Sequence, residues 1–218
     1  MVFKRLSGLF GERPGATPAR RGPFGLGLGR AVSFDLLRLK LELDKLAMQP
    51  PAETLVISGH GIAQLDASAL IHRYYNDDNT ILQVLCSDGI GDENIREITL
   101  FHPWDEVVPS SPAEWAAWDG TNGRIGAPAF EADGFHFERV WGEPATAWVP
   151  PAEFTEEVAA GDGEPRLIHQ KIMPYRRQVG TLVENLLITV ERDLASRDRG
   201  SISFMIGYGL ARADVTPV

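Results

Sequence analysis

The sequence predicts an α+β fold that is predominantly antiparallel β, either a sandwich or a partly open barrel, with a few short helices. Short apolar or alternating segments recur along the chain after Pro50-Pro51, a pattern typical of strands. Pairs that favour tight turns, such as Asp88-Gly89 and Asn122-Gly123, separate many of these segments. Strands connected by such hairpins lie antiparallel and stack as sandwiches or close into barrels.

The first 30 residues are predicted to form a flexible basic tail. Six glycines and three prolines lie between residues 11 and 30, so this stretch cannot bury enough apolar surface to fold alone. Residues 1–30 carry a net charge of +5, which leaves −14 for the rest of the chain. The amphipathic start is expected to contact an anionic membrane or a partner groove through Phe3, Lys4, Arg5, Leu6, Leu9 and Phe10. The alternative is a disordered start without a role.

Globular structure is expected from residue 31 to residue 218. Its first segment, Ser33–Leu46, has two interpretations. Its leucines alternate with charged residues as in a strand, yet several of them also share one helical face. Its content of Leu, Lys and Glu favours the helix.

Nine strands are predicted after Pro51, at Leu55–Ser58, Leu70–Tyr75, Ile81–Leu85, Ile95–Phe101, Phe135–Trp141, Ala145–Val149, Leu167–Met173, Leu186–Glu191 and Ile202–Tyr208. Two short helices interrupt them. Ser111–Trp118 begins with a capping serine and a proline, and Gly120 follows its end. Pro151–Ala160 begins with a proline and acidic residues, which suit a helix N-terminus, and Gly161 follows.

A weak internal similarity suggests two related β halves, at about 31–125 and 126–218. Arg73-Tyr74-Tyr75 before Ile81–Val84 resembles Pro174–Arg177 before Leu186–Val190, since each pairs an aromatic and basic strand end with an apolar strand. Chance similarity between short strand patterns is the alternative explanation.

Composition and charge limit the class of protein. The chain has 218 residues, enough for a buried core, and a single cysteine, Cys86, which excludes an internal disulfide framework and suits the cytoplasm. Cys86 follows an apolar run, so a packed thiol is expected. No apolar run reaches the roughly 18–20 residues that a membrane span needs. The net charge of −9 disfavours nucleic acid as a partner.

No metal site or catalytic centre is predicted. His60, His72 and His102 lack the spacings typical of zinc sites, and Asp77-Asp78 lacks the ligand pattern of a calcium loop. The chain also lacks a nucleophile elbow, and its glycine-rich segment follows no strand. We therefore predict no metal, no cofactor and no catalytic residue.

A binding surface is the favoured kind of site. The stretch from His72 to Asp78 places aromatic, basic and acidic side chains beside an apolar strand. Tyr, Trp and Arg, the types enriched in binding hot spots, recur farther along the chain. The candidate binding residues are His72, Arg73, Tyr74, Tyr75, Asp77, Asp78, Trp104, Arg139, Trp141, Tyr175 and Arg176. The alternative is that most of them pack in the core or pair across strands.

Several segments resemble the YjfK-like family of bacterial proteins of unknown function. They are His72–Asp78 with Thr80–Leu85, Phe101–Asp105, Arg139–Gly142, Met173–Arg177 and Glu184–Glu191, and the likeness extends over residues 31–215. The resemblance implies genes nearby for a PspA-like membrane-remodelling protein, small membrane proteins and a glutathionylspermidine-synthase-like ligase. It implies no catalytic residues, because the family has none established.

The first hypothesis is a non-enzymatic cytoplasmic accessory or adaptor protein that binds a protein partner at or near the inner membrane. The resemblance implies a PspA-like protein of a membrane-stress system as that partner. The alternative is an enzyme acting on a small polar or polyamine-linked substrate, which an acidic body would attract. Its site would contain His72, Arg73, Asp77 and Asp78. A homo-oligomeric structural module is a third hypothesis.

Overall fold

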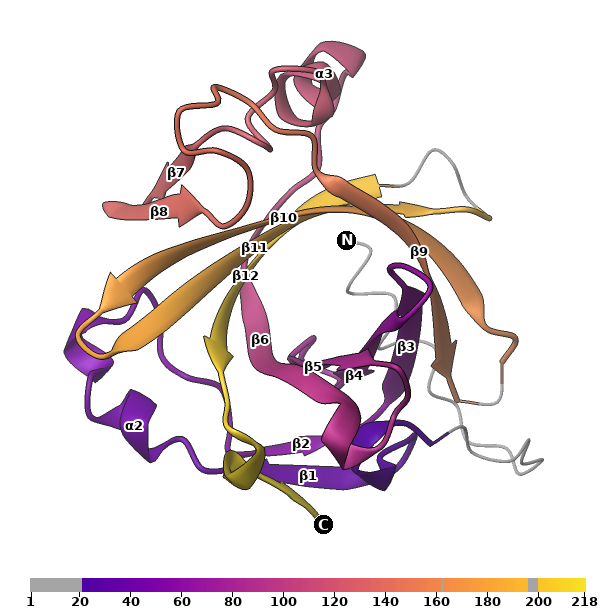
Figure 1. Cartoon of the computed structure of the whole chain (residues 1–218). Helices are drawn as coiled ribbons and strands as arrows, with labels where there is room; N and C mark the ends of the chain where they lie inside the picture. The colour runs from indigo at the N-terminus through magenta and orange to yellow at the C-terminus, as the bar shows by residue number, and fades with distance from the viewer. Residues whose placement is uncertain (1–20, 162, 196–199) are drawn as a thin grey trace.

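The chain forms a closed β-barrel in a computed structural model that describes residues 21–161, 163–195 and 200–218 (Figure 1). Its wall consists of β3 (Gly59–Gln64), β4 (Ala69–Tyr75), β5 (Ile81–Ser87), β6 (Ile95–Val107), β9 (Ala152–Ala160), β10 (Arg166–Val179), β11 (Leu182–Asp193) and β12 (Gly200–Gly209). Around the ring they follow the order β11-β12-β6-β5-β4-β3-β9-β10, and β10 pairs with β11 to close it. Neighbours in the ring are antiparallel.

Two four-stranded meanders build this barrel. Strands β3 to β6 form the first and strands β9 to β12 form the second. They join at two seams, where β3 pairs with β9 and β6 pairs with β12. Each strand of one meander therefore has a counterpart in the other, as two related halves would require. The internal repeat itself stays a prediction.

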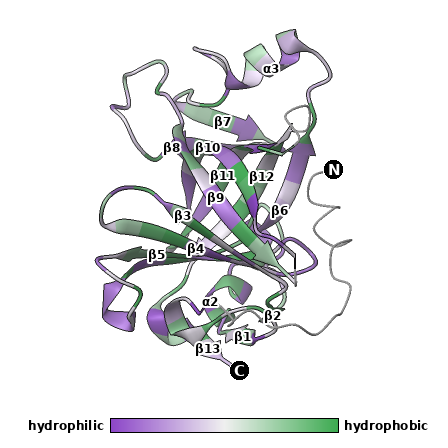
Figure 2. Cartoon of the chain, turned by 90° about the vertical axis from the view of Figure 1, so that its right-hand side faces the viewer, coloured by the Kyte–Doolittle hydropathy of each residue, from purple (hydrophilic) through white to green (hydrophobic). Residues whose placement is uncertain are grey.

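Smaller elements lie on two sides of the barrel (Figures 1 and 2). On one side is a three-stranded sheet of β13 (Val215–Pro217), β1 (Ala31–Phe34) and β2 (Thr54–Val56). Opposite it is a lobe, residues 108–149, that connects the meanders and contains α3 (Pro112–Asp119), β7 (Ala129–Ala132) and β8 (Phe135–Arg139). The remaining elements are short helical turns, η2 (Pro23–Gly25), α2 (Leu37–Lys40), η3 (Leu43–Lys45), η4 (Asp92–Asn94) and η5 (Arg212–Asp214).

Strand alternation divides the core into two clusters. Figure 2 shows hydrophilic and hydrophobic residues mixed along individual barrel strands. The smaller cluster lies inside the barrel and includes Ile71, Tyr75, Phe101, Phe154 and Leu187. The larger one joins the outer face of the barrel to the small sheet and the lobe, and it includes Val32, Tyr74, Leu82, Phe130 and Phe204. Cys86 is buried in the outer cluster, which confirms the packed thiol.

The prediction of a β-rich fold with a few short helices is confirmed, and the barrel is closed rather than partly open. The helix at Ser111–Trp118 is present as α3, whose first turn is capped by Ser111 Oγ accepting from Glu114 N at 3.2 Å. Ala145–Val149 forms no strand but lies in a loop of the lobe.

The prediction of a helix at Pro151–Ala160 is wrong, because this segment is β9. Its residues pair with β3 on one side and with β10 on the other. Phe154, Glu156 and Val158 are buried at alternate positions, while Glu153, Thr155 and Glu157 lie on the other face. Alanine and glutamate favour a helix locally, but ladder bonds on both edges and burial of the alternate residues favour the strand.

The segment Ser33–Leu46 is neither one strand nor one helix. It begins as β1 and continues through α2 and η3. Leu36, Leu39 and Leu46 are buried, whereas Leu37 and Leu41 are exposed, so the helical face that the leucines share is the face that packs.

The described part of the predicted tail, residues 21–30, packs against the barrel, so the boundary at residue 31 is corrected. The Leu26 side chain is fully buried in the outer cluster. The Tyr74 hydroxyl donates to the Pro23 carbonyl at 3.1 Å, and the Gly29 N–H donates to the Ile57 carbonyl at 2.8 Å. Residues 1–20, which contain the amphipathic start, lie outside the described residues.

Candidate functional site

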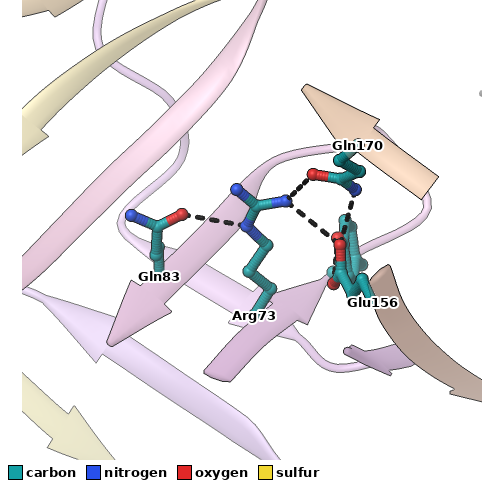
Figure 3. Close-up of polar contacts among 5 residues, drawn as sticks. Arg73, Gln83, Glu156 and Gln170 are labelled. Atoms are coloured by element: carbon teal, nitrogen blue, oxygen red, sulfur yellow. Dashed lines mark hydrogen bonds and ion pairs between the residues drawn. The ribbon is translucent and has the colours of Figure 1, made fainter. Parts of the chain in front are cut away.

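Five polar side chains meet inside the barrel, and we name them the interior network: Arg73, Tyr75, Gln83, Glu156 and Gln170 (Figure 3). Arg73 donates through Nη1 to Glu156 Oε2 at 3.0 Å and through Nε to Gln83 Oε1 at 2.9 Å. Tyr75 and Gln170 also donate to the Glu156 carboxylate, each at 2.6 Å. These bonds join β4 to β9 and β10, which are not its neighbours in the ring, so they cross the interior.

A glycine of β3 makes room for this network. Strand β3 runs between β4 and β9, and its Gly61 lies opposite Arg73 and Val158. A Cβ atom at Gly61 would lie 1.7 Å from Glu156 Oε1. The Glu156 carboxylate thus occupies space that any other residue at position 61 would fill. Glycine at this position allows the buried Arg73–Glu156 ion pair to form.

Another buried carboxyl group, Glu191 of β11, interacts with the network. Burial raises the pKa of Glu191 to about 8, and the negative charge of Glu156 adds to the effect. Glu191 is therefore mostly protonated at neutral pH. Burial is the largest single effect on Arg73 and lowers its pKa, but the charges of Glu156, Tyr75 and Glu191 together outweigh it, so that the pKa of the guanidinium is raised. Burial and Glu156 also raise the pKa of Tyr75 well above its ordinary value.

The interior keeps some unused hydrogen-bonding capacity. Arg73 Nη2, Ser201 Oγ and Ser203 Oγ are buried and have no hydrogen-bond partner among the residues that the structure describes. Ser201 lies opposite Glu191, and Ser203 lies opposite Thr189, where β12 pairs with β11. Glu156, by contrast, already accepts from three side chains. A carboxylate held in this way neutralises Arg73 and holds strands together.

His72 and Tyr74 lie on the outer face of the same strand. The ring of His72 is hydrogen-bonded to His60, with Nδ1 and Nε2 3.1 Å apart. His60 stacks on Tyr74 with ring centroids 4.7 Å apart, and Tyr74 in turn bonds the Pro23 carbonyl. This face of β4 therefore anchors residues 21–30, while Arg73 and Tyr75 point the other way.

Arg139 and Tyr175 hold the lobe on the barrel. Arg139 donates to four backbone carbonyl groups, those of Gly126, Trp141, Glu143 and Thr146. The Gly126 N–H donates to the Tyr175 hydroxyl at 3.0 Å. Two further candidate residues pack around the core: Trp104 against Phe137, and Trp141 against both clusters.

The remaining candidate residues lie on the surface. Arg176 is exposed and lines an open hollow of about 570 Å³ with His136 and Glu138. Asp77 and Asp78 are exposed in the turn between β4 and β5, and Asp78 lines a different hollow. The candidate residues of the sequence are thus distributed over the interior, two outer faces, the lobe and a turn.

Comparison with known proteins identifies the family of this chain. Residues 2–216 match the family described as protein of unknown function (DUF2491). The protein belongs to the DUF2491 family. It is similar to the uncharacterized protein YjfK of Escherichia coli (strain K12), with 25% identity over 160 residues, 73% of this chain and 72% of that protein. No solved structure matches the chain.

The family match confirms the YjfK-like resemblance and extends it into the first 30 residues. Of the five residues of the interior network in this DUF2491 protein, the sequence predicted only Arg73 and Tyr75 as candidate site residues. Glu156 was missed because it lies in a segment predicted to be a helix. Gln83, Gln170 and Glu191 were missed because nothing in the sequence distinguishes them from other polar residues of strands. A polar residue at an inward position of an alternating strand is the signal that sequence offers, and it requires knowing which face is inside.

Neither a metal centre nor a membrane span stands out in the described parts of the chain. Residues 21–161, 163–195 and 200–218 contain no group of three or more His, Cys, Asp and Glu side chains that could hold a metal ion. The helices within these ranges are all too short or too polar to cross a bilayer. The predicted contact residues Phe3, Lys4, Arg5, Leu6, Leu9 and Phe10 lie outside the described ranges.

Proposed function

We propose that this protein is a non-enzymatic accessory protein that binds another protein at or near the inner membrane. The separation of the candidate side chains supports this proposal. Arg73 lies inside the barrel, His72 lies on its outer face, and Asp77 and Asp78 lie at a surface turn. The enzymatic alternative needs these groups around one substrate, within hydrogen-bonding reach of it. A binding protein has no such requirement.

An open strand edge favours strand addition as the binding mode. Strand β7 ends the order of the ten-stranded sheet, and within the described ranges it pairs with β8 alone. Figure 1 shows β7 in the lobe that projects from the barrel. An extended segment of a partner protein forms backbone hydrogen bonds at such an edge and thereby lengthens the sheet.

The register of β7 identifies the groups that face the open edge. The Arg139 N–H donates to the Pro128 carbonyl at 2.9 Å. Hydrogen-bonded pairs alternate with non-bonded pairs along an antiparallel ladder. The backbone groups of Phe130 therefore bond to β8, and those of Ala129 and Glu131 point to the open edge. Since the Phe130 side chain is also buried, β7 is held in place while its outer edge stays open.

The location and the partner are proposed on sequence grounds. Residues 1–10 combine Phe3, Leu6 and Phe10 with Lys4 and Arg5. Segments of this kind bind anionic lipid surfaces, although one so short binds weakly by itself. The YjfK-like resemblance makes a PspA-like membrane-remodelling protein the proposed partner.

Capture of a purified PspA-like protein by the full-length chain tests the proposal. The wild-type chain is expected to capture it. Glu131→Pro removes an N–H at the open edge and leaves the bonds between β7 and β8 intact. We expect it to weaken capture by about tenfold, which corresponds to ~1.4 kcal/mol.

Glu131→Ala is the matched control, because both variants lose the Glu131–His136 ion pair and only the proline loses the N–H. Glu131→Ala is expected to bind as the wild type does. Equal loss of capture by the two variants contradicts strand addition at β7. If the wild-type chain neither captures the PspA-like protein nor sediments with anionic vesicles, the proposed function is wrong.

A further inference from the structure

A short segment, residues 22–28, which we name the strap, packs against a pair of buried histidines on the outer face of the barrel. A Cβ atom at Gly22 would lie 2.7 Å from His72 Nδ1 and 2.4 Å from the Tyr74 hydroxyl, so the backbone of the strap runs directly against both side chains. His60 and His72 are 3% and 2% exposed, and their rings share one hydrogen bond. The strap and the histidine pair therefore form one packed unit.

The surroundings of the two rings disfavour a positive charge. Ile62 and Val84 lie opposite His72 on the neighbouring strands, and Ala159 lies opposite His60 on β9. Burial in such surroundings disfavours the charged form of histidine. A hydrogen bond between two imidazoles also needs one N–H donor and one acceptor. One added proton on each ring would place N–H groups on both atoms of the shared bond and break it.

The charged and titratable groups that face the pair leave this preference in place. Tyr74 of β4 stacks on one of the rings and stays neutral, because burial holds its pKa far above the physiological range. Cys86 of β5 is neutral as well, since burial raises the pKa of its thiol. Glu157 of β9 lies on the same outer face but is only half-buried, so water screens its charge. Arg21, at the start of the strap, is exposed and positive, which disfavours a further positive charge nearby.

The strap is held by few contacts and contains a strained residue. The bond from Tyr74 to the Pro23 carbonyl and the burial of Leu26 hold it on the barrel wall. Phe24 has a φ of 60°, a left-handed conformation that costs a non-glycine residue about 1–2 kcal/mol. Release of the strap removes this strain and exposes the histidine rings to water. The chain then stays attached from Gly29 onward, where backbone bonds to the barrel begin.

We propose that the His60–His72 pair is a pH-sensitive switch that releases the strap in mildly acidic solution. A solvated histidine takes up a proton near pH 6.5, whereas the covered pair stays neutral. The released state therefore binds more protons, and falling pH favours it.

Release of the strap lengthens the tether of the basic N-terminal segment. Residues 22–28 extend by up to about 24 Å when they are free, which exceeds the Debye length of about 8–10 Å. The segment can then reach an anionic surface while the acidic barrel, with a net charge of −14 over residues 31–218, stays beyond the range of repulsion. This consequence rests on the membrane contact proposed above, whereas the switch itself does not.

Hydrogen–deuterium exchange of the full-length protein at pH 7.5 and pH 5.5 tests the switch, with rates corrected for the intrinsic effect of pH. The reporters are Gly22, Gly25 and Leu26, whose N–H groups are bonded within the strap. Their protection should fall at least about tenfold at pH 5.5, because the released state takes up at least one more proton. Equal protection at the two pH values overturns the proposal.

Histidine variants assign the pH dependence to the pair. A double variant, His60→Phe with His72→Phe, keeps two aromatic rings without titrating nitrogens, so its protection should be the same at both pH values. Each single variant should show a smaller fall than the wild type, which keeps the test valid if the double variant does not fold. His169→Phe removes a partly exposed histidine of β10 and should keep the full fall. A full fall in the double variant or in both single variants overturns the proposal.

Sedimentation with vesicles of equal parts phosphatidylglycerol and phosphatidylcholine tests the longer tether. The wild type should bind up to about tenfold more tightly at pH 5.5 than at pH 7.5, since affinity follows the fraction of the released state. The double histidine variant should bind equally at both. Tyr74→Phe, which loses the bond to Pro23, should bind about fivefold more tightly than the wild type at pH 7.5, as for the loss of one hydrogen bond.

The two measurements separate the switch from the membrane contact. If exchange depends on pH but no form of the protein binds vesicles, the proposed membrane contact is wrong and the switch stands. If exchange depends on pH while vesicle binding is equal at both pH values, the longer tether is wrong.

Discussion

Arg73 and Glu156 show at the scale of single residues how a barrel interior holds opposite charges. Each is buried, and each is hydrogen-bonded to side chains from several strands. Removal of one partner from such a pair leaves an uncompensated charge, which typically costs about 3–5 kcal/mol. The pair therefore explains why a charged side chain can stand at a buried, inward position of β4.

Glu191→Gln is expected to make the protein more stable at pH 8 than the wild type, with equal stability near pH 4. The folded state holds the proton of Glu191 up to a pKa of about 8, whereas the ordinary value is 4.5. Between these values the folded state binds more protons than the unfolded state. The free energy of unfolding then falls as pH rises, by at most about 1.4 kcal/mol per pH unit. Glutamine has no proton to release, so the variant loses this decline.

Urea unfolding at several pH values measures this difference. Glu131→Gln, which alters an exposed carboxylate, is the control and should keep the decline of the wild type. If Glu191→Gln declines with pH as steeply as the wild type, the carboxyl group of Glu191 is not protonated in the folded protein.

Single residues also show how much of the interior network the sequence predicts. Arg73 and Tyr75 were identified because the aromatic and basic stretch is visible in the sequence. Their neighbour Tyr74 was identified for the same reason, although it faces the opposite side. The carboxylate of Glu156 could not be connected with them, because 83 residues separate it from Arg73 and only the ring order brings β9 near β4.

At the scale of elements, β9 illustrates how tertiary structure overrides local preference. Its N-terminal proline, acidic residues and alanines favour a helix. The helix α3 carries a similar start and does form, since Ser111 caps it and the lobe leaves it without strands on either side. The difference lies in the neighbours, because β9 fills the gap between β3 and β10.

The loop of the lobe, residues 140–149, is expected to loosen in Arg139→Met. Arg139 is bonded to the carbonyl groups of Trp141, Glu143 and Thr146 in this loop. Methionine keeps an unbranched apolar stem but donates no hydrogen bond. Amide hydrogen exchange over residues 140–149 should become at least about tenfold faster, as for a loss of ~1.4 kcal/mol in local opening.

Arg176→Met is the matched control for this experiment, because Arg176 is exposed on the next strand and makes no side-chain hydrogen bond to the described residues. Its exchange pattern should equal that of the wild type. The same acceleration in both variants would mean that charge, rather than the bonds of Arg139, governs the loop.

At the scale of the whole molecule, the two meanders and the lobe are expected to unfold together. The seams between β3 and β9 and between β6 and β12 make each meander the neighbour of the other on both edges. Phe130 of the lobe packs against Phe204 and Tyr175 of the barrel, with ring centroids 5.5 and 6.0 Å apart. Neither part can lose its partner without exposing core residues, which is the condition for a cooperative transition.

Two probes of urea unfolding test this cooperativity. All five tryptophans lie between residues 104 and 148, so their fluorescence reports mainly on the lobe and its junction. Far-ultraviolet circular dichroism reports on the strands of the barrel. The two midpoints should coincide, and a lower midpoint for fluorescence would show that the lobe unfolds first.

The sequence by itself determined the β-rich class, the capped helix α3, most strand positions and the family. These depend on residues close together in the chain, where alternation, caps and turn pairs act. Only the tertiary structure decided that the barrel closes, that Pro151–Ala160 is a strand, and that residues 21–30 pack on its wall. It also decided that Arg73 meets Glu156 inside the barrel, while Asp78 and His102 line one hollow outside it. The reason is physical: burial and ladder bonds come from partners distant in sequence, and one residue of register decides which face of a strand is the inside.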